Sequence, residues 1–85
     1  MVLSFQDEVA RVRARYATLL RRLGLYPEAE AAIRRALEEA LDPFTRARVE
    51  SEAGILQAAQ GRPLEALALL SRAEAYFRTT GERPK

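Results

Sequence analysis

Hydrophobic side chains recur every three or four residues along four segments of this chain. Because an α-helix turns 100° per residue, such spacing gathers apolar side chains on one face. In the first segment the face covers an arc of roughly 80°. Its members are Phe5, Val9, Val12, Tyr16, Leu19 and Leu23. This pattern predicts an amphipathic helix whose apolar face packs against the rest of the chain.

Three later segments repeat the pattern with smaller side chains, mostly alanine. In the second segment the inner face consists of Ala29, Ile33, Ala36, Leu37 and Ala40. In the third it consists of Phe44, Val49, Ala53 and Leu56. In the fourth it consists of Ala66, Leu70, Ala73 and Phe77. The chain is therefore predicted to be all-α, with four helices.

Capping residues, prolines and glycines separate the four segments. The polar residues that can cap a helix start are Ser4 and Asp42. The prolines suited to a first turn are Pro27, Pro43 and Pro63, and the glycines and proline that end helices are Gly24, Gly61, Gly81 and Pro84. Connections this short force neighbouring helices to run antiparallel. We expect one domain over residues 1–85, made of two helical hairpins at about 4–41 and 43–80.

The two hairpins also resemble each other in sequence. At an offset of 37 residues, six positions of the first are identical in the second. The pairs are Gly24 and Gly61, Glu28 and Glu65, Ala29 and Ala66, Ala31 and Ala68, Arg35 and Arg72, and Ala36 and Ala73. A fixed-period echo of this kind is typical of repeat proteins, which usually bind partners and rarely catalyse reactions.

Each half resembles a tetratricopeptide repeat (TPR). In that pattern a small residue in helix A and a glycine at its end precede an alanine, a bulky apolar residue and another alanine in helix B. The second half matches with Gly54, Gly61, Ala66, Leu70 and Ala73, and the first with Ala17, Gly24, Ala29, Ile33 and Ala36. The family resemblance implies a short α-solenoid. The stretch from residue 46 to 84 is most similar to degenerate repeats of bacterial regulators and stand-alone bacterial TPR proteins.

The chain also departs from the family pattern. Arg13 and Glu50 stand where helix A usually carries an aromatic residue, and the spacing is 37 residues where about 34 is usual. Gly54 is still informative, because a glycine inside a helix costs about 1 kcal/mol relative to alanine. We therefore expect Gly54 to serve close packing between helices three and four.

Composition narrows the possible source and location. Of 14 basic residues 13 are arginine, and the chain has no Cys, His, Trp or Asn. Scarce thermolabile residues with abundant arginine and glutamate fit a thermophile, although a GC-rich genome would also favour arginine over lysine. Residues 1–8 lack the features of a signal peptide, and no apolar run could span a membrane. The expected location is the cytoplasm.

Candidate chemistry is sparse. The serines have no histidine that could act as their base, so we expect no enzyme activity. Glu38, Glu39 and Asp42 could attract a cation, but their spacing fits no calcium loop and a solvated face is the simpler explanation. Neither a cofactor nor a metal is predicted. The net charge of only +2 makes nucleic acid an unlikely partner.

The better candidate is a row of basic residues, Arg11, Arg15 and Arg22, on one flank of the first helix. Arginine suits carboxylates and phosphates. The family resemblance implies that helix A of each repeat lines a concave groove. Its residues would be Arg11, Thr18, Arg21, Arg22, Arg48, Ser51 and Ile55. The alternative is that these arginines are solvated, or paired with the chain's own acids, of which residues 28–42 carry five.

A second candidate surface lies at the end of the repeat array. Such arrays usually need at least three units, because each leaves an apolar face for the next. Leu67, Leu69 and Tyr76 would stand where a third unit docks, and could instead mediate self-association. The last six residues resemble a linker, so the chain could also belong to a longer array. Alternatively, the helices twist enough to cover the surface themselves.

These observations lead to one expectation with two alternatives. The expected function is a non-catalytic protein–protein interaction module that binds a peptide or helix in the groove, or a partner at the open end. The first alternative is a small homodimeric helical bundle with a structural role. The second is binding of an anionic ligand or nucleic acid through the arginine row.

Overall fold

A computed structural model describes residues 4–81, which form four α-helices. They are α1 (Phe5–Arg22), α2 (Tyr26–Glu39), α3 (Pro43–Ala59) and α4 (Pro63–Thr80). No strand occurs within residues 4–81, so the predicted all-α fold of helical hairpins is confirmed.

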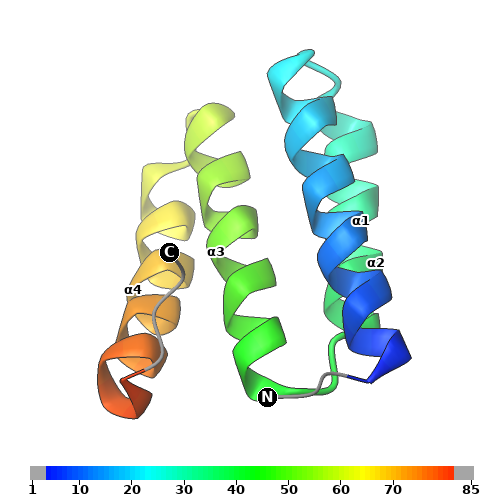
Figure 1. The fold of residues 1–85 in the computed structure, drawn as a ribbon. Coiled ribbons are helices and arrows are strands. Elements are labelled where there is room, and N and C mark those ends of the chain that lie inside the picture. The colour runs from blue at the N-terminus through cyan, green and yellow to red at the C-terminus, as the bar shows by residue number, and fades with distance from the viewer. Residues whose placement is uncertain (1–3, 82–85) are drawn as a thin grey trace.

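The helices form two antiparallel pairs, α1 with α2 and α3 with α4. Helix α3 connects the pairs because it also packs against α1 and α2. Figure 1 shows α3 between α4 on one side and the α1–α2 pair on the other. Of the four described helices, α3 contacts all the others, whereas α4 contacts only α3. The face of α1 that points away from α2 and α3 therefore has none of the four described helices against it.

The predicted helix ends are largely confirmed. The Asp7 amide donates to Ser4 Oγ at 3.1 Å, and the Asp42 carboxylate accepts from the amides of Phe44 and Thr45 at 2.9 and 3.3 Å. The glycines after three of the helices have φ between 74° and 79°, a left-handed conformation that costs glycine little. Pro84, expected to follow the last helix, lies outside the described residues.

The core is built chiefly from alanine. Eleven of the sixteen buried hydrophobic residues are alanines, which lets the helix axes approach closely. The predicted inner faces of α2 and α3 are buried here, with Leu37 and Phe44 half-buried at the margins. A smaller cluster joins α3 to the end of α4, where the rings of Phe44 and Phe77 meet edge to face at 5.8 Å.

Gly54 lies at a close approach of α3 to α4. A Cβ atom at this position would stand 2.8 Å from Leu70 Cγ and 3.2 Å from the carbonyl oxygen of Ala66. A Cβ practically never approaches another heavy atom to 2.8 Å, so no side chain fits here unless the two helices or Leu70 shift. The predicted packing role of Gly54 is confirmed.

The expected orientation of α1 is wrong. The buried side of this helix carries Asp7, Ala10, Ala14, Ala17 and Leu20. The large apolar residues predicted to form its inner face point the other way, and all except the half-buried Val9 are exposed. Physically, alanines allow α1 to approach α2 and α3 closely, which bulkier side chains would prevent.

Candidate partner-binding cleft

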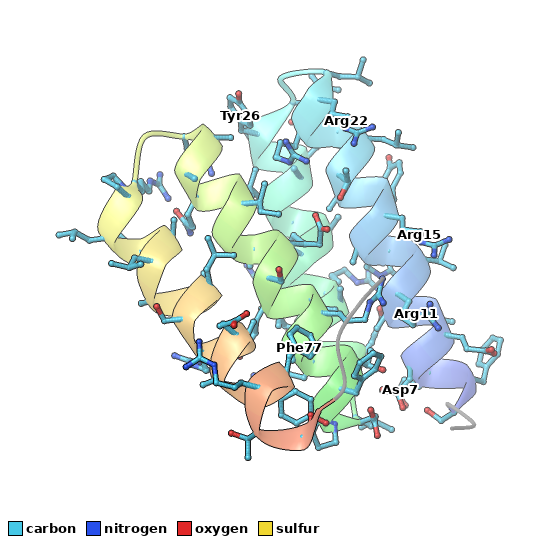
Figure 2. The ribbon with its side chains drawn as sticks, turned by 60° about the vertical axis from the view of Figure 1, so that its left-hand side comes forward. Asp7, Arg11, Arg15, Arg22, Tyr26 and Phe77 are labelled. Atoms are coloured by element: carbon cyan, nitrogen blue, oxygen red, sulfur yellow. The ribbon has the colours of Figure 1, made fainter. Side chains whose placement is uncertain are left out.

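A cleft of about 120 Å³ separates α1 from α3 and brings together several of the predicted groove residues. Its walls are Arg11, Ala14 and Arg15 from α1, and Arg48, Val49, Ser51 and Glu52 from α3. Figure 2 shows Arg11, Arg15 and Arg22 following one another along the same flank of α1. The cleft thus combines predicted residues from both hairpins with Arg15 of the basic row.

The three cleft arginines lack an acidic partner in the described part of the chain. Within residues 4–81, none of Arg11, Arg15 and Arg48 forms an ion pair with a carboxylate. The internal pairing considered from the sequence is therefore not found for these residues. Other arginines do pair internally: Arg13 donates to both oxygens of Glu39 at 2.7 and 2.9 Å, and so fastens α1 to α2.

Arg48 is the most constrained of the three. Its guanidinium lies 5.9 Å from the centre of the Phe44 ring and is half-buried. Desolvation lowers the pKa of Arg48, and the positive charges of Arg11 and Arg15 lower it further, against an opposing effect of Glu52. The cleft therefore holds concentrated positive charge that the chain only partly neutralises.

Glu52 and Thr18 bridge the cleft along one side. The Thr18 hydroxyl donates to Glu52 Oε2 at 2.7 Å and also to the Ala14 carbonyl oxygen at 3.2 Å. This contact joins α1 to α3 and fixes the position of the carboxylate beside the arginines. Thr18 thus has a structural partner, and Glu52 limits the net charge of the cleft.

The remaining predicted groove residues do not line this cleft. Arg22 is exposed near the end of α1, while Arg21 is half-buried. Ile55 is 37 % exposed and lies one turn beyond Ser51 on α3. The seven residues thus separate into three that line the cleft, Thr18 beside it, and three elsewhere.

The three residues predicted for an open end do not form one exposed patch. Leu67 is 62 % exposed, but Leu69 is half-buried against the main core cluster. Tyr76 is half-buried and its ring meets Phe77 edge to face at 5.6 Å. Only Leu67 of the three is largely available to a partner. The larger exposed apolar surface lies instead on α1.

Two of the three acidic residues near the end of α2, Glu39 and Asp42, already have structural partners. Hydrogen bonding by Arg13 lowers the pKa of Glu39, against the opposing effect of desolvation, and Asp42 caps α3. Across residues 4–81 no three Asp, Glu, His or Cys side chains gather into a group that could hold a metal ion. None of the described helices has both the length and the apolar character needed to cross a membrane.

Sequence reasoning missed the main role of Asp7. Its side chain is buried, and Oδ1 accepts from the backbone amides of Leu41 and Asp42 at 2.7 and 2.9 Å. Oδ2 accepts from the Ser4 hydroxyl at 2.7 Å. The spacing from Ser4 to Asp7 indicated a helix start, but no local signal indicates a bond to residues 34 and 35 positions away.

The comparisons with protein-family models, with curated proteins and with solved structures gave no match.

Proposed function

We propose that this chain is a non-catalytic protein-interaction module of the tetratricopeptide type, which binds an acidic segment of a partner protein in the α1–α3 cleft. One observation carries the proposal. A cleft between two helices from different hairpins is surrounded by Arg11, Arg15 and Arg48, none of which has an acidic partner within residues 4–81.

Electrostatics favours an anionic occupant. The charged form of Arg48 is disfavoured by desolvation and by the nearby positive charges of Arg11 and Arg15. A carboxylate placed among them would relieve that repulsion and would accept charge-assisted hydrogen bonds, which are about twice as strong as neutral ones. Because the two helices are held by the core, their backbone needs little ordering on binding, and the main ordering cost falls on the arginine side chains.

The helical framework supports the same proposal. The antiparallel pairs, the close approach at Gly54 and the left-handed glycines after α1 and α3 are features that a two-repeat array of this type needs. The cleft is also small and open, which suits a side chain or a short segment better than an enclosed small molecule.

The test uses a fluorescein-labelled decapeptide of glutamate as probe and follows its anisotropy. We expect Arg48→Gln and Arg11→Gln each to weaken binding by about tenfold, because each removes a charge-assisted contact. Arg34→Gln is the matched control, since Arg34 is exposed on α2 and has no ion pair among the described residues.

Two results would contradict the proposal. If Arg34→Gln weakens binding as much as Arg48→Gln, the peptide is responding to overall charge and not to the cleft. If a single-stranded DNA of similar charge binds more tightly than the peptide, with a steeper dependence on salt, the arginines serve a nucleic acid.

A further inference from the structure

The exposed face of α1 carries a continuous apolar stripe. Its members are Phe5, Val9, Val12, Tyr16, Leu19 and Leu23, and we call them the α1 stripe. Five of the six side chains have exposed fractions between 56 % and 81 %. Helices α2 and α3 both pack on the alanine side of α1. Within residues 4–81, therefore, no helix covers the stripe.

The spacing within the α1 stripe indicates what kind of element would cover it. Its members follow one another at intervals of four, three, four, three and four residues. This alternation is the heptad pattern by which two helices pack side by side along their length, at a crossing angle of about 20°. The natural occupant is therefore another helix with the same spacing, rather than a strand or an extended peptide.

We propose that the α1 stripe binds the α1 stripe of a second copy of this chain, with the two helices antiparallel about a two-fold axis. An isologous interface of this kind needs only one self-complementary surface. If a fully exposed residue of this size presents roughly 150–200 Å², the lower part of the range for aromatic side chains, the five residues present at most on the order of 600 Å² in each copy. The sum of about 1,200 Å² reaches the lower end of stable interfaces.

The antiparallel arrangement brings opposite charges together along one flank of the α1 stripe. When Phe5 of one copy lies opposite Leu23 of the other, Glu8 on the flank faces Arg22 of the second copy. The two-fold axis generates two such Glu8–Arg22 pairs and places the two Arg15 side chains opposite each other. This flank then has two attractive charge pairs and one repulsive pair. On the opposite flank Arg13 is already neutralised by Glu39 of its own chain. This inference does not depend on the α1–α3 cleft.

Sedimentation equilibrium between micromolar and millimolar concentrations tests the interface. We expect a concentration-dependent dimer that Val12→Glu weakens by roughly 30-fold or more, as loss of a central interface contact does. Leu67→Glu is the matched control, because it places the same charge on a similarly exposed apolar residue of α4. A wild-type chain that stays monomeric at millimolar concentration, or a dimer broken by Leu67→Glu alone, overturns the proposal.

Charge exchange tests the direction of the two helices. Glu8→Arg alone and Arg22→Glu alone should each weaken the dimer, and the two changes together should restore it. Circular dichroism confirms that each variant is folded; if Val12→Glu is not, Leu19→Arg replaces it. A dimer indifferent to Arg22→Glu overturns the antiparallel arrangement.

Discussion

Replacing Gly54 by leucine is expected to lower the melting temperature by about 10–20 °C, because overpacking a close helix contact costs about 3 kcal/mol or more. At this position even a Cβ atom would stand 2.8 Å from Leu70 Cγ. The three further carbon atoms of leucine would have to enter space that α4 occupies. The helices or Leu70 must move, and the close contact between α3 and α4 at this position would be lost.

Thermal unfolding followed by circular dichroism measures this effect, with Ala58→Leu as control. Ala58 lies one turn further along α3 and is exposed, so leucine there adds the same three carbon atoms beyond Cβ without a clash. The smaller change Gly54→Ala should also lower the melting temperature. Adding Leu70→Ala should partly restore it, because that change removes the side-chain atoms nearest to the new Cβ. A Gly54→Leu chain that melts within 2 °C of the wild type (a margin of about 0.5 kcal/mol) would refute the close-packing explanation.

Replacing Asp7 by alanine is expected to lower the melting temperature by about 10 °C. The buried carboxylate accepts from the amides of Leu41 and Asp42 and from the Ser4 hydroxyl. Without it, two backbone donors in the α2–α3 connection lose their acceptor, and α1 loses its attachment to that connection. A suitable control is Glu28→Ala, which removes an exposed acid from the first turn of α2.

The contribution of Asp7 should also depend on pH. Hydrogen bonding by the Asp42 amide, reinforced by Ser4 and Leu41, lowers the pKa of Asp7 despite desolvation. A lowered carboxyl pKa stabilises the fold fully above the ordinary value of about 4, and this stability is lost as the pH falls through the lowered pKa. The difference in stability between wild type and Asp7→Asn should therefore shrink below pH 4. A difference that stays constant to pH 2 would show that the charge of Asp7 does not stabilise the fold.

The helix boundaries were predictable because their causes are local. Ser4 and Asp42 each bond to amides within three residues, and the glycines after the helices need only their own backbone freedom. Gly54 was also interpretable, since a mid-helix glycine implies a close neighbour. Each of these signals depends on a short stretch of chain and not on the three-dimensional arrangement.

The surface of α1 was not predictable in the same way. A hydrophobic pattern identifies the most apolar face of a helix, but it does not identify which face the rest of the chain covers. In α1 the covered face is made of alanines such as Ala10 and Ala14, which contribute little to the pattern. The cleft was partly foreseen through Arg11 and Arg48, whereas its unpaired charge depends on where Glu39 and Glu52 lie.

The way the helices contact one another also bears on how quickly the chain folds. Among the four described helices, each contact joins either consecutive helices or two helices separated by a single helix. Helix α4 contacts only α3. Contacts between positions close along the chain require little loop closure before they stabilise the structure. Each hairpin can form early and without long-range guidance, so folding of this chain belongs in the fast, microsecond-to-millisecond class of small helical domains.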